Sequence, residues 1–128
     1  KIAPDKKALY HAAAVMSAGH IAALFSASVE LLAECGVSTD EARKVLGPLV
    51  VSTAANLEHY SPEDALTGPF ARGDRETIEK NLHAIRSSAH PDLAEIYCLL
   101  GLRSLDLARK KGISEEDIQA ITAILRSK

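Results

Sequence analysis

Tryptophan is absent from this chain of 128 residues, and aromatic residues make up only 4% of it. Hydrophobic residues nevertheless account for 47%, so the core must consist mainly of alanine, leucine, isoleucine and valine. No segment alternates apolar and polar residues as a half-buried strand does, and no internal repeat or low-complexity tract is present. These features predict an all-α protein, and the length predicts a single helical domain over residues 1–128.

The chain also lacks a cluster of basic residues. Its 15 Lys and Arg stand against 17 Asp and Glu, which gives a net charge of −2. Nucleic acid is therefore not an expected partner, because binding it requires a positive patch that neutralises phosphates. The two cysteines, Cys35 and Cys98, show no CxxC spacing and favour a reduced, cytoplasmic compartment.

Motifs for cofactors and metals are missing as well. No GxGxxG sequence and no P-loop occurs, so no cofactor site is expected within this chain. The five histidines lack ligand-like spacing, so no metal site is expected. Ser17 and His20 are neighbours on a helix, but no acidic residue nearby in the sequence could orient the histidine as a base.

One long stretch contains no charged residue. From Ala8 to Val29 there is no Asp, Glu, Lys or Arg, which is long enough to raise the question of a membrane span. The stretch includes His11, His20 and three serines, however, and a helix that is apolar or small on every side is typical of the centre of a bundle. We therefore expect a long central N-terminal helix, no membrane insertion, and a homodimer that buries part of this helix.

Capping residues and helix breakers divide the remainder. Gly36 ends the first helix, and Ser38 begins a second with a capping-box pattern and Pro48 inside it. The predicted helices after the first cover about Ser38–Tyr60, Ser61–Leu66, Arg75–Ser88, Asp92–Lys111 and Ser114–Leu125. The sequence thus predicts a bundle of five or six helices.

The stretch Leu66–Asp74, LTGPFARGD, interrupts this pattern. Turn chemistry accounts for Gly68, Pro69 and Asp74 as helix stop, helix breaker and N-cap. It does not account for Arg72. Two hypotheses remain for this residue. Its guanidinium pairs with a nearby carboxylate such as Glu63 or Asp64, or it faces a cleft and binds a carboxylate or phosphate. On the second helix a face of uncharged polar residues leads toward this stretch, namely Ser52, Thr53, Asn56, His59 and Tyr60.

Three segments together resemble one family: YHAAAVMSAG, LTGPFARGD and YCLLGLRSLDLARKKG. This family is the helical C-terminal domain of Rossmann-like oxidoreductases, known as domain of unknown function 2520. Its fold is similar to the helical domains of 6-phosphogluconate dehydrogenase, pyrroline-carboxylate reductase and ketopantoate reductase. In one departure, Gly19 stands where the family commonly has asparagine.

The resemblance implies a division of labour. An N-terminal Rossmann domain of the same protein, preceding Lys1, would bind NADP, and this chain would supply the substrate side and the dimerisation surface. The chain alone would not be catalytically competent. No residue is identified as catalytic, and the expected substrate-cleft residues are His11, Ser17, Asn56, Thr67, Gly68, Pro69, Arg72 and Asp74. The alternative is a non-enzymatic helical module that binds a protein or a small ligand through the polar face.

Overall fold

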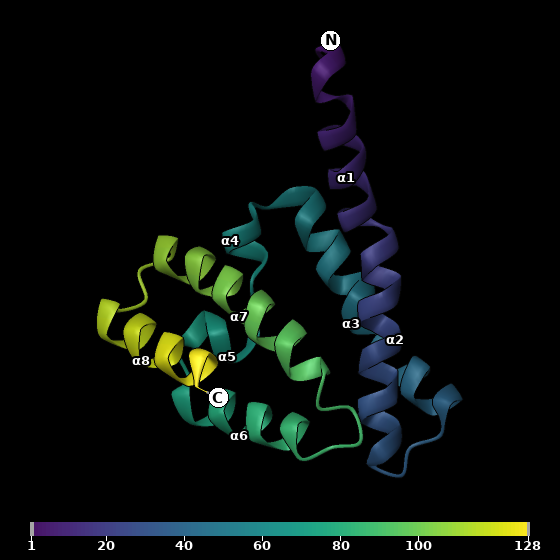
Figure 1. The fold of residues 1–128 in the computed structure, drawn as a ribbon, viewed down its shortest axis with the longest axis vertical. Coiled ribbons are helices and arrows are strands. Elements are labelled where there is room, and N and C mark those ends of the chain that lie inside the picture. Colours follow the sequence, from purple (N-terminus) through teal and green to yellow (C-terminus); the bar gives the residue numbers. More distant parts are fainter. Residues whose placement is uncertain (1, 128) are drawn as a thin grey trace. The chain divides into compact units, whose positions relative to one another are not determined.

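The computed structural model describes residues 2–127, and the regular structure in this range is entirely helical (Figure 1). The prediction of an all-α fold is confirmed. The helices are η1 (Pro4–Lys6), α1 (Lys7–Ser17), α2 (Gly19–Glu34), α3 (Thr39–His59), α4 (Pro62–Ala65), α5 (Gly68–Arg72), α6 (Arg75–Arg86), α7 (Leu93–Lys110) and α8 (Glu115–Arg126).

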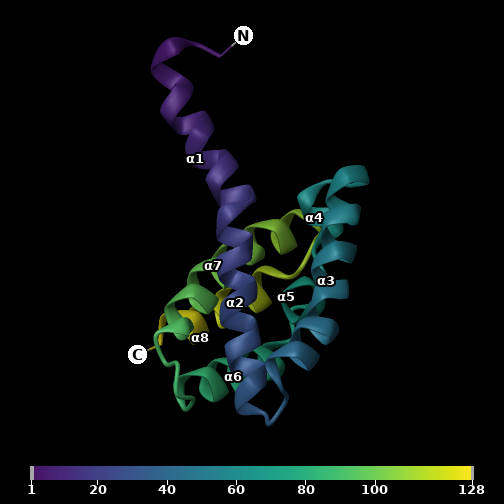
Figure 2. The same cartoon turned by 90° about the vertical axis from the view of Figure 1, so that its right-hand side faces the viewer.

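Two of these boundaries differ from the predicted ones. The first helix is divided at Ala18, whose φ of −127° and ψ of −69° lie outside the helical region. Its N–H donates to the carbonyl of Val15 at 3.4 Å, and α2 continues from α1 beyond this break (Figure 2). The second difference is α5, a short helix inside the stretch expected to be a loop. Pro69 lies in its first turn, where a fixed φ favours helix initiation.

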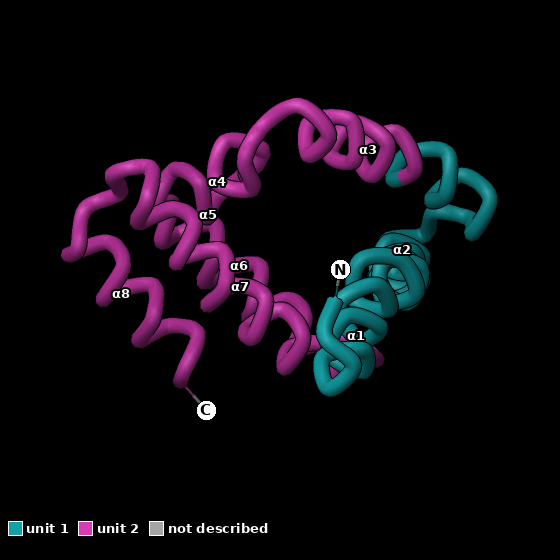
Figure 3. The backbone as a smooth tube through the Cα atoms, turned by 90° about the horizontal axis from the view of Figure 1, so that it is seen from above, with its two compact units in different colours: residues 1–46 teal, residues 47–128 magenta. Residues whose placement is uncertain are grey.

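The chain forms two compact units, Lys1–Leu46 and Gly47–Lys128 (Figure 3). The boundary falls within α3, next to Pro48. Proline has no N–H to donate to the preceding turn, so the helical hydrogen-bond ladder is weakened at this point.

In unit 1 the first helix is not the centre of a core, and this part of the prediction was wrong. No residue of α1 is buried, and Val29 is the one buried residue of α2. The main packing partners of α1 are its chain neighbours η1 and α2. The absence of charged residues from Ala8 to Val29 led to the prediction that this helix is buried. A helix without a polar face, however, does not indicate which other element packs against it.

The same helix is the one span within the described residues that is long and apolar enough to cross a membrane. It comprises Pro4–Glu34. Its most apolar window of 18 residues has a mean hydropathy of 1.6, and 6% of that window is buried. The core helix of a soluble protein or a signal sequence satisfies the same criteria, so a single span of this kind is weak evidence for a membrane protein.

Unit 2 contains the hydrophobic core. In it α7 packs against α4, α5, α6 and α8, and α6 also packs against α8. These helices are amphipathic, and their apolar faces converge on a buried cluster. The cluster consists of Ile78, Leu105, Ala108, Ile118, Ile121 and Leu125.

The predicted helix starts are confirmed where side chains cap them. Ser38 and Glu41 form the reciprocal capping box, with N···O distances of 3.2 and 3.3 Å. The hydroxyls of Ser61 and Ser114 accept hydrogen bonds from the third residue of α4 and α8, respectively. These local contacts fix the ends of the helices that carry the candidate site.

Candidate functional site

The structure gathers most of the predicted cleft residues in one segment. Thr67, Gly68, Pro69, Arg72 and Asp74 all lie on α5 or directly beside it in unit 2. The other three lie elsewhere: Asn56 is a half-buried residue of α3, while His11 and Ser17 are exposed residues of α1 in unit 1.

The α5 segment is a single helical turn between two glycines with positive φ. Gly68 has a φ of +82° and Gly73 a φ of +65°, a region that side chains disfavour and glycine adopts at little cost. After Gly73 reverses the chain, the N–H of Asp74 donates to the carbonyl of Pro69 at 2.9 Å. This closes the end of α5 in the manner of a Schellman motif and leads directly into α6.

Phe70 anchors this turn to the core, a role that the sequence analysis missed. Its ring is half-buried against the core cluster, and its centroid lies 5.8 Å from that of Tyr97. It also lies over the backbone of α7, because a Cβ added to Gly101 would be 2.8 Å from Phe70 Cζ. Phe70 is the one aromatic residue of LTGPFARGD, and this feature could have been used to predict that it packs against the core.

Gly73 brings the segment against the beginning of α8. A Cβ at Gly73 would lie 3.3 Å from Cβ of Asp117 and 3.4 Å from Cγ2 of Ile113. Both neighbours belong to the turn and first residues of α8, so Gly73 permits a close approach as well as a left-handed conformation.

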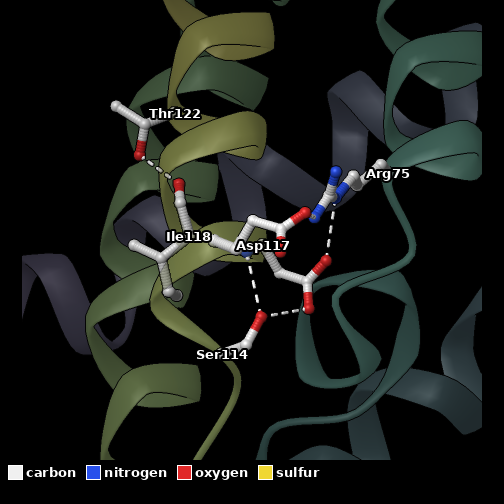
Figure 4. Close-up of polar contacts among 6 residues, drawn as sticks. Arg75, Ser114, Asp117, Ile118 and Thr122 are labelled. Carbon is white, nitrogen blue, oxygen red and sulfur yellow. Dashed lines mark hydrogen bonds and ion pairs between the residues drawn. The ribbon is translucent and has the colours of Figure 1, made fainter.

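Arg75, at the start of α6, forms ion pairs with two carboxylates at the start of α8. Its Nε donates to Asp117 Oδ1 at 2.8 Å (Figure 4). An Nη donates to Glu116 Oε1 at 3.0 Å. The pKa of Asp117 is lowered, first by the hydroxyl of Ser114 and then by the Arg75 guanidinium. The start of α6 is thereby tied to the start of α8.

Asp74 is committed to capping α6. Its Oδ1 accepts from the N–H of Thr77 at 3.1 Å, and its Oδ2 accepts from the Thr77 hydroxyl at 2.8 Å. These two bonds are the principal reasons why the pKa of Asp74 is lowered. The predicted N-cap role is confirmed, and both carboxylate oxygens have partners within the fold.

Arg72 makes no comparable contact. Its side chain is 66% exposed, and its ion pair with Asp74 spans 3.8 Å. The partners suggested by the sequence are engaged elsewhere, since Glu63 pairs with Lys110 at 4.0 Å and Asp64 with Lys111 at 3.3 Å. Arg72 thus pairs with a nearby carboxylate, as one of the two hypotheses expected, but the partner is Asp74 and not Glu63 or Asp64. Its guanidinium is directed mainly to solvent.

The polar face of α3 is also accessible. Ser52, His59 and Tyr60 are exposed, and the hydroxyl of Thr53 donates to the carbonyl of Leu49 at 2.9 Å. Within residues 2–127, no three His, Cys, Asp or Glu residues come together as a metal site would require. The chemistry available at these positions is hydrogen bonding and, at Arg72, the binding of an anion.

A family model described as "Domain of unknown function (DUF2520)" matches residues 1–104. No curated protein and no solved structure matches the chain significantly. The matched range includes the whole of the α5 segment and most of α7, and it ends before α8 begins.

Proposed function

From the premise that the chain belongs to the DUF2520 family, we propose that it is the substrate-side and dimerisation domain of a cytoplasmic NADP-dependent oxidoreductase. A Rossmann domain N-terminal to it would bind the dinucleotide. The chain described here contains no GxGxxG sequence to hold the pyrophosphate. NADP would supply hydride transfer when bound, and the helical domain would bind and orient the substrate.

The observation that supports this proposal is the division of roles within LTGPFARGD. Phe70 packs over α7, Gly73 approaches α8, and Asp74 caps α6. Arg72 does none of these, and its nearest carboxylate contact is 3.8 Å long. A mostly exposed arginine with one long ion pair, on a turn that Phe70, Gly73 and Asp74 anchor, is suited to bind a ligand.

The planar guanidinium of Arg72 favours one class of partner. It presents several N–H donors in a fixed plane, which matches a substrate carboxylate or the 2′-phosphate of NADP. Thr67 adds an exposed hydroxyl at the other end of the same turn. Arg72 would orient the anionic group, while no residue of this chain is assigned to proton transfer.

The test compares the 128-residue chain with a longer protein in which the proposed Rossmann domain precedes Lys1. Calorimetry with NADPH and NADH should detect binding only in the longer protein. If Arg72 binds the 2′-phosphate, Arg72→Ala in that protein should weaken the binding of NADPH about tenfold and leave the binding of NADH unchanged. The size follows because one charge-assisted hydrogen bond is worth ~1.5–3 kcal/mol. If Arg72 binds the substrate carboxylate, both cofactors should bind unchanged and KM for the acidic substrate should rise about tenfold.

Two results would contradict the proposal. Micromolar binding of NADPH to the 128-residue chain would mean that the dinucleotide site lies within it. A longer protein whose preceding sequence lacks a strand, a GxGxxG turn and a helix would favour the second candidate, a non-enzymatic helical interaction module. The exposed apolar side chains of α1 and α2, such as Leu9 and Met16, support that alternative.

A further inference from the structure

The hydroxyl of Tyr97 on α7 is held in place by the fold but keeps its own hydrogen available. The Tyr97 ring packs against the core cluster, and its centroid lies 5.8 Å from that of Phe70. The side-chain amide of Asn81 on α6 donates to the hydroxyl oxygen at 3.3 Å. Within residues 2–127 the Tyr97 O–H donates to no protein acceptor. Tyr97 is therefore a positioned hydrogen-bond donor that the fold does not use.

The same face of α6 also meets Arg72. The Arg72 guanidinium pairs at 3.8 Å with Asp74, which is the N-cap of α6. Asn81 follows Asp74 by seven residues, which is about two helical turns, so both side chains lie on one face of the helix. Arg72 contacts this face at its beginning, and Tyr97 contacts it about two turns further along. The packing of α5 and α7 on α6 thus places a guanidinium and a phenolic O–H along one line.

The ionisation of these groups suits them to bind an anion with a second, neutral oxygen. Burial raises the pKa of Tyr97, so its hydroxyl stays protonated at neutral pH. Both oxygens of Asp74 already accept hydrogen bonds from Thr77, and the Arg72 side chain remains 66% exposed. Arg72 can therefore bind an external carboxylate while Asp74 stays in its capping position.

The spacing of the two groups favours one length of ligand. At about 1.5 Å per residue, the Cα atoms of Asp74 and Asn81 are roughly 10 Å apart. Hydrogen bonds of about 2.9 Å at each end leave roughly 4 Å between the two oxygens of a ligand that bridges Arg72 and Tyr97. A 2-oxo acid is too short, because its carbonyl carbon is bonded directly to the carboxyl carbon. Two methylene groups between the carboxylate and the carbonyl give the required reach.

We propose that unit 2 binds an oxo acid at two points, with its carboxylate at Arg72 and its carbonyl oxygen at the Tyr97 hydroxyl. The ligand class is a 4-oxo acid, of which levulinate (4-oxopentanoate) is the simplest stable example. This deepens the proposed function, on which it rests, by naming the substrate class and by assigning Arg72 to the substrate rather than to the 2′-phosphate. The Tyr97 hydrogen bond would stabilise the negative charge that develops on the carbonyl oxygen when hydride from NADPH adds to the carbon.

Titration of the isotope-labelled 128-residue chain with levulinate, followed by NMR, measures this binding without the cofactor. Pentanoate is the matched probe, because it has the same length and carboxylate but no carbonyl. We expect levulinate to bind about fivefold more tightly than pentanoate, which is the effect of one neutral hydrogen bond. It should shift the side-chain signals of Arg72 and Asn81. Pyruvate should bind no more tightly than propionate, because it cannot reach both groups.

Side-chain variants separate the two contacts. Tyr97→Phe keeps the ring beside Phe70 and removes only the hydroxyl, so it should weaken levulinate about fivefold and leave pentanoate unchanged. Arg72→Ala should weaken both probes about tenfold, because each carboxylate loses its charge-assisted partner. Tyr10→Phe is the control. It removes the hydroxyl of an exposed tyrosine in unit 1, and it should change neither affinity.

The results also distinguish the two-point site from the proposed function. If Tyr97→Phe changes levulinate and pentanoate equally, or changes neither, Tyr97 does not bind the carbonyl and the two-point site is wrong, while the role of Arg72 stands. If pyruvate binds more tightly than levulinate, the assigned ligand length is wrong. If no probe binds at tens of millimolar, or Arg72→Ala changes neither affinity, Arg72 is not a carboxylate site. Binding of NADPH to the longer protein would still test the oxidoreductase role independently.

Discussion

The ring of Phe70 lies directly against the backbone of α7 at Gly101. A Cβ added at Gly101 would be 2.8 Å from Phe70 Cζ and 3.0 Å from Leu125 Cδ1, distances that packed carbon atoms do not adopt. The contact joins the middle of LTGPFARGD to a helix that begins about twenty residues later. Phe70 can pack this closely because α7 has no side chain at Gly101. Since Arg72 lies on the same short helix as Phe70, its position depends on this contact.

Gly101→Ala should destabilise unit 2 by about 1 kcal/mol. Overpacking costs ~1–3 kcal/mol, and the better helix propensity of alanine offsets ~1 kcal/mol of it. Urea denaturation monitored by circular dichroism measures the net effect. The control repeats the substitution in a Phe70→Leu background, where the smaller side chain should make Gly101→Ala neutral or stabilising. If Gly101→Ala changes the free energy of unfolding equally in both backgrounds, the contact with Phe70 does not cause the destabilisation.

Arg72 and Arg75 should behave oppositely although only two residues separate them. Arg75→Ala should lower the melting temperature, because it removes hydrogen bonds of 2.8 and 3.0 Å to α8. Arg72→Ala should leave it within about 2 °C, because its side chain is 66% exposed and its ion pair is long. Differential scanning calorimetry of the two variants provides the comparison. A large loss of stability in Arg72→Ala would make this residue structural and remove the support for an anion site.

The features that could be predicted from the sequence are the local ones. Each helix cap joins two residues that are three positions apart, Ser38 with Glu41 and Ser114 with Asp117. The hydrogen bond that forms the cap is therefore predictable from a short stretch of sequence. The ion pair of Arg75 with Asp117 joins residues 42 positions apart, and no local pattern encodes it. It appears only once α6 and α8 are packed together.

Burial of the first helix could not be predicted for a different reason. The stretch from Ala8 to Val29 has no polar face, so its composition indicates that something covers it but not what does. The sequence analysis assumed that the other helices of the chain would cover it. In the structure α1 has no buried residue.

Acidification should reduce the stability of unit 2 through Asp117. Its native pKa is below the ordinary value, because of the Ser114 hydroxyl first and Arg75 second. The unfolded chain therefore takes up this proton at a higher pH than the native chain. The stabilisation is complete above the unfolded pKa and is lost as the pH falls through the lower native pKa. Melting temperatures of wild type and Asp117→Asn should converge on acidification, whereas Glu79→Gln, at an exposed site, should follow wild type throughout. A constant gap between wild type and Asp117→Asn would contradict this assignment.

The last prediction concerns α8, which lies beyond the range matched by the family model. Ile121 is fully buried, and Leu125 is 4% exposed within the same core cluster. Removing a buried isoleucine side chain costs ~2–5 kcal/mol, because transfer energy is lost and a cavity remains. Ile121→Ala should therefore destabilise the chain by about 3 kcal/mol in urea denaturation, with the dependence on urea concentration unchanged. Ala123→Ser, at an exposed site on the same helix, should change stability by at most about 0.5 kcal/mol. If Ile121→Ala costs as little as Ala123→Ser, α8 does not stabilise the core, and residues 1–104 suffice to hold Phe70 and the α5 turn in place.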